Sequence, residues 1–130
     1  MEGKQLIVVE RASLTEEAIR LLDILRTTSF NDCYPLSREF KELPNRLGIY
    51  AIKHRSQGIL YIGKSGNVKS RLRGGHKALG WAFIDRLDPD DVRIAVARVS
   101  FEWTRLSLQL ESIMLRQIRP PYNDRIAQED

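Results

Sequence analysis

Two tyrosines and an arginine lie close together near the middle of the chain. Tyr50 ends the tripeptide Gly48-Ile49-Tyr50, Tyr61 begins the tripeptide Tyr61-Ile62-Gly63, and Arg71 follows ten residues after Tyr61. A guanidinium is a planar, permanently charged fork that suits the oxygens of a phosphate group. Two tyrosines on adjacent strands could bring their hydroxyls to the same place. The spacing therefore indicates a site for an anionic substrate.

The charge distribution supports a polyanionic partner. The whole chain of 130 residues has a formal net charge of +4 and a pI near 9.5. No acidic residue lies between Glu42 and Asp85, so the positive potential is concentrated on that segment. The basic residues of this segment are Arg46, Lys53, Arg55, Lys64, Lys69, Arg71, Arg73 and Lys77.

The local patterns predict a hairpin followed by a helix around the tyrosines. Residues 47–53 and 59–63 are rich in β-branched and aromatic side chains and flank a polar turn. Asn67 and its neighbour Gly66 then lead into a short helix over residues 68–74, which Gly74-Gly75 should end. The same residues, Gly58 to Ser65, match the spacing of a phosphate-binding loop. Their apolar centre favours a strand, so we do not expect nucleotide hydrolysis.

Further elements are predicted on both sides of the hairpin. Upstream, residues 5–10 favour a strand, Ser13 and Glu16 form a capping signal for an amphipathic helix over 14–27, and 27–45 is a connector. Downstream, the patterns predict a helix over 79–87, a third strand over 92–101 and a long helix over 103–118 that Pro120-Pro121 stops.

The expected fold class is α+β, with a small three-stranded mixed or antiparallel sheet flanked by helices and an N-terminal strand and helix extension. The predicted organisation is an extension at 1–43, a main domain at 44–125 and a frayed tail at 126–130.

The composition of the chain indicates the cellular compartment in which we expect the protein. Cys33 is the single cysteine, which excludes an intrachain disulfide and a zinc site built from cysteines, and we expect it to have no chemical role. No run of about 18 apolar residues is present, and the first residues lack the layout of a secretion signal. We therefore expect a cytoplasmic protein without a membrane partner.

The paired tripeptides, together with Asn67, Arg71, Glu111 and Asn123, resemble the GIY-YIG nuclease superfamily. The resemblance covers roughly residues 44–125. It implies a small sheet flanked by helices and a metal-dependent hydrolysis of phosphodiester bonds at one active site per domain. The catalytic residues that it implies are Tyr50, Tyr61, Arg71, His76 and Glu111.

Specific roles follow from this resemblance. Glu111 would hold Mg²⁺ or Mn²⁺, Arg71 would stabilise charge in the transition state, Tyr50 would position or deprotonate water, and Tyr61 would contact phosphate or water. His76 departs from the pattern, because many relatives carry a histidine or tyrosine four residues after the arginine and here it comes five residues after. It can serve only if Gly74-Gly75 breaks the helix. Another histidine, His54, is expected at the surface.

The expected partner is DNA, and RNA is not excluded. The residues expected to contact nucleic acid are Lys64, Arg71, Arg73, Lys77 and Asn123. Asn123 is expected to brace the site more than to take part in chemistry. Two alternatives stay open: a binding module that grips nucleic acid without hydrolysis, and an adaptor whose N-terminal helix makes a homodimer. A partner protein could also supply specificity, which this sequence does not encode in any appended DNA-binding motif.

Overall fold

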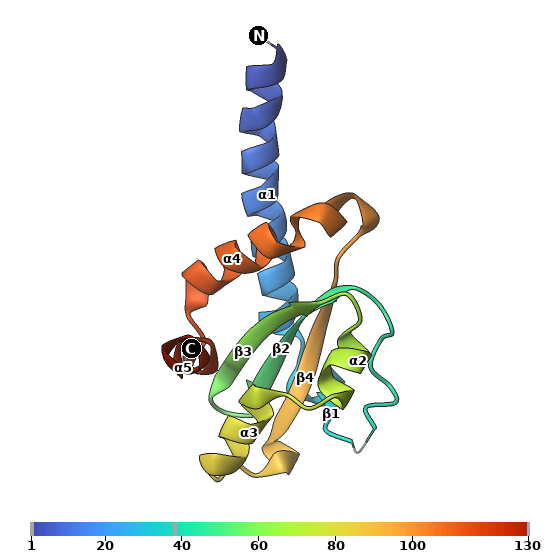
Figure 1. The fold of residues 1–130 in the computed structure, drawn as a ribbon, viewed down its shortest axis with the longest axis vertical. Helices are drawn as coiled ribbons and strands as arrows, with labels where there is room; N and C mark the ends of the chain where they lie inside the picture. Colours follow the sequence, from blue (N-terminus) through green and yellow to red (C-terminus); the bar gives the residue numbers. More distant parts are fainter. Residues whose placement is uncertain (1, 38, 130) are drawn as a thin grey trace.

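The computed structural model describes the backbone of residues 2–37 and 39–129 and the side chains of residues 13–37 and 39–126. Its centre is a four-stranded antiparallel sheet with the order β1-β4-β2-β3 (Figure 1). The strands are β1 (Tyr34–Pro35), β2 (Gly48–His54), β3 (Gly58–Ser65) and β4 (Val92–Arg98). The predicted α+β class and the three main strands are confirmed, and β1 adds a short fourth strand within the predicted connector.

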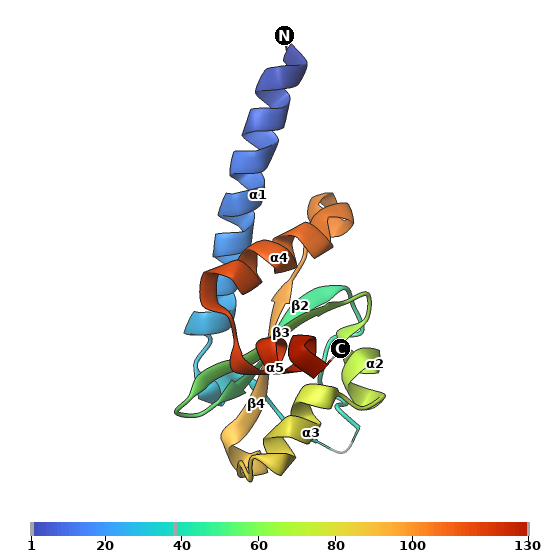
Figure 2. The same ribbon diagram turned by 60° about the vertical axis from the view of Figure 1, so that its left-hand side comes forward.

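Five α-helices surround the sheet. They are α1 (Glu2–Thr27), α2 (Val68–Arg73), α3 (Lys77–Ile84), α4 (Ser107–Ile118) and α5 (Pro121–Glu129). Short 3₁₀ turns precede or join them at Phe30–Asp32, Pro89–Asp91 and Phe101–Leu106. Figure 2 shows α1 on one side of the sheet and α2 and α3 on the other. Among the described residues, no helix combines the length and the apolar character needed to cross a membrane.

Two corrections concern the N-terminal region. The predicted strand at residues 5–10 is wrong, because these residues lie inside α1. Short apolar runs do not distinguish a strand from a helix by periodicity alone, and here a longer helix includes the run. The predicted capping signal at Ser13 and Glu16 is also wrong, because α1 already begins at Glu2. Glu17 of this helix is buried, and its carboxylate accepts two hydrogen bonds from the Arg20 guanidinium at 2.6 and 2.7 Å.

The C-terminal residues also differ from the prediction. Pro120-Pro121 ends α4 as expected, but Pro121 is at the same time the first residue of α5, where the missing N–H of proline costs nothing. Helix α5 continues through Glu129, where a frayed tail was predicted from residue 126. This helix matters for function because Tyr122 and Asn123 in its first turn attach it to the rest of the domain.

The first core cluster lies on the side of the sheet covered by α1 and α4. Alternation along β2 sends Ile49 and Ala51 to this side, where they meet Leu21 and Leu25 of α1 and Met114 of α4. Because the α1 side chains are fully buried against the sheet, the N-terminal extension shares its core with the rest of the domain. The boundary proposed at residue 44 stays a prediction.

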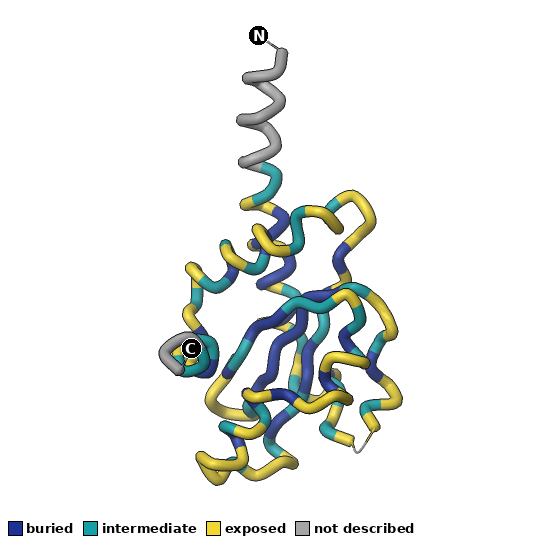
Figure 3. Tube along the Cα trace, viewed as in Figure 1, coloured by how far each residue is buried: buried dark blue, intermediate teal, exposed yellow. Residues whose placement is uncertain are grey.

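The second core cluster lies on the opposite side and includes Tyr50 and Ile52 of β2, Leu72 of α2, Ala82 of α3 and Tyr122 of α5. Figure 3 shows β2 as the most continuously buried strand of the sheet, and β4 beside it is largely buried. Of the candidate catalytic residues, Tyr50, Tyr61 and His76 lie on this second side with Arg71 of α2, whereas Glu111 lies on α4, which contacts the edge strand β3.

Candidate active site

The two tyrosines occupy diagonal positions on adjacent strands. Tyr50 lies opposite Gly63 and Tyr61 lies opposite Ile52, so the two tyrosines are not directly paired. A register shift after Ile52 introduces an irregularity near the start of β3, and both Leu60 and Tyr61 belong to the second core cluster. The two rings still meet, with centroids 6.1 Å apart. Diagonal neighbours are within reach of aromatic side chains, so the shared site survives the different register.

Gly63 is the strand position that makes room for this arrangement. A Cβ atom built at Gly63 would lie 2.6 Å from Tyr50 Oη and 2.8 Å from Tyr61 Cε1. Both contacts are shorter than real Cβ atoms show, so any larger residue must displace a tyrosine. The glycine of the second tripeptide is therefore required by the packing of the two functional rings.

His76 joins the tyrosines despite its shift by one residue. Gly75 has a φ of +91°, a left-handed conformation that glycine adopts without a steric penalty, and it separates α2 from α3. His76 is thereby released from α2 and becomes the N-cap of α3, where its Nδ1 accepts the Ala78 amide at 3.0 Å. The condition set by the sequence, a helix broken at the two glycines, is fulfilled.

The hydrogen bonds of His76 determine which ring nitrogen carries the proton. Since Nδ1 accepts the Ala78 N–H, the neutral ring carries its proton on Nε2 and donates it to Tyr50 Oη, 2.8 Å away. The Tyr61 ring stacks edge-on against the same imidazole with a centroid distance of 4.7 Å. A chain of donors thus runs from the Ala78 amide through His76 to the oxygen of Tyr50.

Burial controls the ionisation of these three side chains. It lowers the pKa of His76 to about 4, with a further contribution from the positive charge of Arg71. Burial also raises the pKa of Tyr50 above its usual range, an effect that Arg71 opposes and Glu111 reinforces. The pKa of Tyr61 is raised in the same way. In the free protein the imidazole and both phenols are therefore neutral near pH 7.

Arg71 lies in the last turn of α2 and is exposed. The helix begins at Asn67, whose side chain accepts the Ser70 amide at 3.0 Å, and this cap fixes the start of the helix that carries the arginine. Its Nη1 donates to the carbonyl oxygen of Gly75 at 3.0 Å. This bond holds the guanidinium beside the glycine break, and the residue is exposed to solvent.

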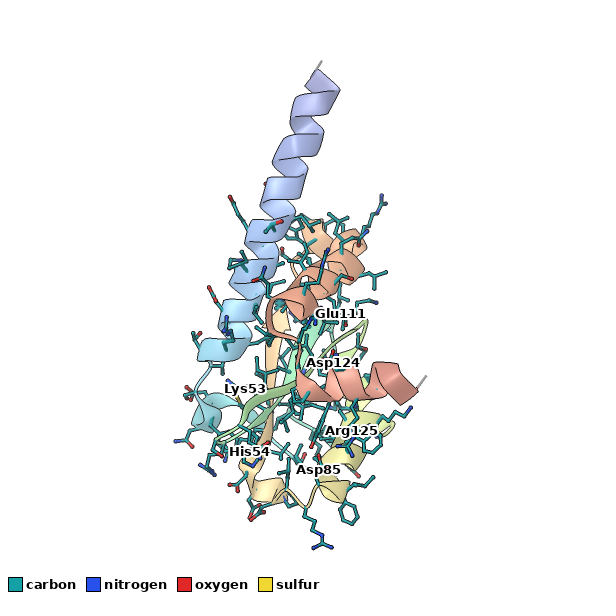
Figure 4. All side chains as sticks on the ribbon, turned by 90° about the vertical axis from the view of Figure 1, so that its left-hand side faces the viewer. Lys53, His54, Asp85, Glu111, Asp124 and Arg125 are labelled. Atoms are coloured by element: carbon teal, nitrogen blue, oxygen red, sulfur yellow. The ribbon has the colours of Figure 1, made fainter. Side chains whose placement is uncertain are left out.

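Glu111 lies at the edge of α4 next to β3 (Figure 4). Its neighbour Leu110 and Met114 one turn later are fully buried in the first core cluster, which fixes the orientation of the helix. Burial raises the pKa of Glu111, and the charge and the backbone N–H of Lys64 act in the opposite direction. Within the described residues, its carboxylate has no ion-pair partner within 4.0 Å.

The chemistry of these donors fits one hard divalent cation. The described residues contain no group of three or more histidine, cysteine or acidic side chains that could enclose a metal ion. A half-buried carboxylate without an ion-pair partner can still bind an ion that keeps several water molecules and takes further oxygens from a phosphate, as Mg²⁺ does. The site would therefore be completed by substrate.

The basic residues divide into two groups. Arg71, Arg73 and Lys77 lie around the break between α2 and α3 and are exposed, and Lys64 is half-buried beside Glu111. Their contact with nucleic acid stays a prediction. Lys53 and Arg55, by contrast, serve the structure itself and lie elsewhere on β2 and its turn.

Lys53 has a structural role that was not predicted from the sequence. Its side chain is buried, and Nζ donates to the carbonyl oxygens of Leu25, Arg26 and Thr28 at the end of α1, at 2.8, 3.3 and 2.7 Å. A cation there compensates the negative end of the helix dipole. Arg55 pairs with Asp91 at 2.9 Å. The alternation of β2, which sends Lys53 to the side of Ile49 and Ala51, was the signal available in the sequence.

Asn123 fastens α5 to the edge strand β3. Its Oδ1 accepts the amide N–H of Ile62 and its Nδ2 donates to the carbonyl of the same residue, both at 2.8 Å. This supports the bracing role expected for Asn123, and its contact with nucleic acid stays a prediction. A second attachment joins Tyr122 and Arg125 to Asp85 at 2.8 Å, which Figure 4 shows for the charged pair.

The remaining candidates lie outside the site. Cys33 is buried in the first core cluster, and burial raises the pKa of its thiol. His54 lies in the hairpin turn, where its Nδ1 accepts the amides of Ser56 and Gln57 at 3.1 and 3.2 Å. The segment Gly58–Ser65 is strand β3 over its whole length, so it cannot form a phosphate-binding loop.

Comparison with known proteins assigns the family. The model of the GIY-YIG catalytic domain matches residues 46–123, which include strands β2, β3 and β4, the tyrosines, Arg71, His76 and Glu111. This match covers more than half of the chain, and the chain belongs to the GIY-YIG family.

Curated relatives share this part of the sequence. UvrABC system protein C of Psychrobacter cryohalolentis is 31% identical over 94 residues, which is 68% of this chain and 14% of that protein. The same protein of Chlorobium chlorochromatii is 27% identical over 92 residues, again 68% of this chain and 14% of the relative. That of Chromohalobacter salexigens is 31% identical over 80 residues, or 58% and 12%. The chain thus spans only a small part of these relatives, and no solved structure gives a significant match.

Proposed function

We propose that the protein is a divalent-metal-dependent DNA endonuclease that nicks one strand at each active site. The observation that carries this proposal is the convergence of the Tyr50, Tyr61 and His76 cluster with Arg71 and Glu111. These five side chains come from β2, β3, α2, α4 and the start of α3, inside a nuclease family domain. A purely structural polar cluster would not need the exposed arginine, or a carboxylate that has no ion-pair partner among the residues whose side chains are described.

Glu111 would hold Mg²⁺ or Mn²⁺ together with phosphate oxygens and water. When bound, such an ion makes its water easier to deprotonate and neutralises charge on the leaving 3′ oxygen. Arg71 would hold the non-bridging oxygens of the scissile phosphate, because its donors match the charge that develops there. Lys64, Arg73 and Lys77 would bind neighbouring phosphates and orient the strand.

Tyr50 would position the attacking water and accept its proton. The Nε2–H of His76 donates to Tyr50 Oη, and this hydrogen bond favours the phenolate over the neutral phenol. In the free protein burial has the larger effect and raises the pKa of Tyr50, while Arg71 counteracts it. The proposal therefore requires additional positive charge from the bound cation before Tyr50 acts as a base. Tyr61 would contact the water or the phosphate.

Substrate, assembly and location are parts of the same proposal. DNA is the expected substrate because the relatives named above are components of the UvrABC system and because the site is rimmed by basic residues. One site per chain cuts one strand, so a double-strand break would need a homodimer or a second event. A partner protein would supply sequence or structure specificity, and we expect the protein to act in the cytoplasm.

The test is cleavage of labelled supercoiled and branched DNA at low salt with Mg²⁺, Mn²⁺ or chelator. Wild type is compared with Glu111→Ala and Arg71→Ala, each verified as folded by circular dichroism. Metal-dependent nicking that both substitutions reduce at least a hundredfold is expected, consistent with the loss of one stabilising charge. Salt-sensitive binding without cutting under any metal would favour a non-catalytic nucleic-acid-binding module instead. Full activity of Glu111→Ala would refute the assigned metal ligand.

A further inference from the structure

A cavity lies on the side of the sheet that carries the tyrosines. It has a volume of about 250 Å³ and is lined by Tyr34, Pro44, Arg46, Leu47, Val96 and Arg98. Val96 pairs directly with Tyr50 in the register of β2 and β4, and Arg98 pairs with Gly48. The cavity is therefore one strand away from the catalytic tyrosine, on the side of β4.

The lining combines positive charge with an aromatic ring. Arg46 and Arg98 are exposed, and within the described residues neither guanidinium has a hydrogen-bond or ion-pair partner. No acidic side chain lines the cavity. Two such forks can hold one phosphate group from two directions. Tyr34 is half-buried beside them and supplies a flat surface on which a base can stack.

The rim of the cavity is continuous with the basic residues of the active site. The carbonyl oxygens of Pro44 and Arg46 accept the amides of Lys69 and Val68 at 3.1 Å, so the rim is fixed to the first turn of α2. Arg71 and Arg73 lie in the last turn of the same helix. Six helical residues span only about 9 Å, so a strand bound at Arg71 reaches the cavity within a few nucleotides. Figure 1 shows the segment before β2 passing beside α2.

We propose that this cavity is a second nucleic-acid subsite that holds one unpaired nucleotide of a DNA strand. Arg46 and Arg98 bind its phosphate and Tyr34 stacks on its base. The volume lies below the roughly 300–1,000 Å³ of typical ligand sites, which suits a single nucleotide and excludes a duplex. This inference rests on the proposed function, because the strand that the subsite holds is the strand that the active site would cut.

The subsite also gives the N-terminal extension a role. Tyr34 and Pro44 precede the matched family region, whereas Arg46, Leu47, Val96 and Arg98 lie inside it. Strand β1 pairs Tyr34 with Ile94 of β4, and this pairing places the ring at the cavity. The preference for an unpaired nucleotide is thus a property of the extension added to the nuclease domain.

The test measures binding in the presence of chelator, so that it does not depend on cleavage. Fluorescence anisotropy compares a labelled single strand with a blunt duplex for wild type and for the double variant Arg46→Gln/Arg98→Gln. The control is Arg26→Gln/Arg86→Gln, which removes the same charge at exposed positions outside the cavity. We expect the cavity variant to bind the single strand at least tenfold more weakly with a smaller salt dependence, and the control to change less than threefold.

Tyr34 supplies the second measurement. Tyr34→Leu should weaken single-strand binding roughly five- to a hundredfold, as loss of one stacked base does, while Tyr34→Phe should bind like wild type. An oligonucleotide with 5-iodouracil should crosslink to the peptide that contains Tyr34. Equal loss in the cavity and control variants, unchanged binding of Tyr34→Leu, or crosslinks confined to other peptides would overturn the subsite. A protein that shows the expected binding but never cuts would keep the subsite and lose the nuclease.

Discussion

The two sides of the sheet differ in the kind of side chain that the same strands bury: one side is mainly apolar and the other includes tyrosines that contact a histidine. Toward α1 and α4, β2 presents Ile49, Ala51 and Lys53. The Nζ atom of Lys53 donates hydrogen bonds to three carbonyl oxygens at the C-terminal end of α1. Toward α2 and α3, the same strand presents Tyr50 to a buried histidine. One side supplies stability and the other holds neutral polar groups ready for a charged ligand. The comparison teaches that burial shifts the pKa values of Tyr50, Tyr61 and His76. The free energy that this burial costs is offset by the apolar packing on the other side of the sheet.

The largest expected loss of stability comes from the first side. Lys53→Met keeps the length of the side chain but leaves three carbonyl oxygens at the end of α1 without their donor. We expect a loss of about 2–3 kcal/mol of unfolding free energy, measured by urea denaturation. The nicking rate per folded molecule should stay within about twofold of wild type. The contrast between the two sides fails if Lys53→Met is as stable as wild type or if its folded fraction is inactive.

A pH-dependent loss of stability of similar size is expected from the second side. The folded pKa of His76, about 4, lies below its ordinary value of 6.5, so the unfolded chain binds the proton more tightly. Stability is therefore unaffected above pH 6.5 and is lost as the pH falls from 6.5 toward 4, by roughly 3 kcal/mol for this shift at about 1.36 kcal/mol per pKa unit. Urea unfolding at several pH values should show this slope in wild type, and His76→Gln should remove it. An unchanged slope in His76→Gln would contradict the assignment.

A smaller effect on stability is expected at Gly63, which lies opposite Tyr50 in the pairing of β2 and β3. Gly63→Ala inserts a Cβ atom 2.6 Å from Tyr50 Oη and should cost about 1–3 kcal/mol through overpacking. Because the displaced ring is the proposed base, nicking should fall at least tenfold. The matched control is Gly66→Ala, where a new Cβ atom meets nothing within 4 Å. Equal behaviour of the two variants in unfolding and nicking assays would refute the steric role of Gly63.

The smallest effect is expected at the brace between α5 and β3. Asn123→Ala removes two hydrogen bonds to Ile62 and should destabilise the protein by about 1–2 kcal/mol. Amide exchange at Ile62 should accelerate in the variant, because its N–H loses its partner. If exchange at Ile62 stays slow in Asn123→Ala, another contact holds the edge of β3.

Much of this arrangement could be predicted from the sequence, for local reasons. Alternating β-branched residues gave the hairpin, Asn67 and the paired glycines bounded α2, and the tripeptides with Arg71 and Glu111 indicated the site and the family. The same sequence could not give the register of Tyr50 and Tyr61. A single irregular position near Leu60 shifts the pairing, and side-chain periodicity does not report it.

The remaining differences arise from tertiary contacts. The run at residues 5–10 reads equally well as strand or helix, and α1 includes it. Lys53 reads as surface charge because its three acceptors come from a helix distant in the sequence. Tyr34 reads as part of a connector, because only its pairing with Ile94 brings it to the sheet.

The most direct test of the central claim is single-turnover nicking of a supercoiled plasmid by Glu111→Gln and Lys53→Met, measured with Mg²⁺ at equal concentrations of folded protein. Glu111→Gln keeps the shape of the side chain and removes its charge, so it should fold with wild-type stability or better and lose at least a hundredfold in rate. Lys53→Met should be less stable and nick at nearly the wild-type rate. Wild-type nicking by Glu111→Gln would contradict the proposal that Glu111 holds the metal ion of the active site.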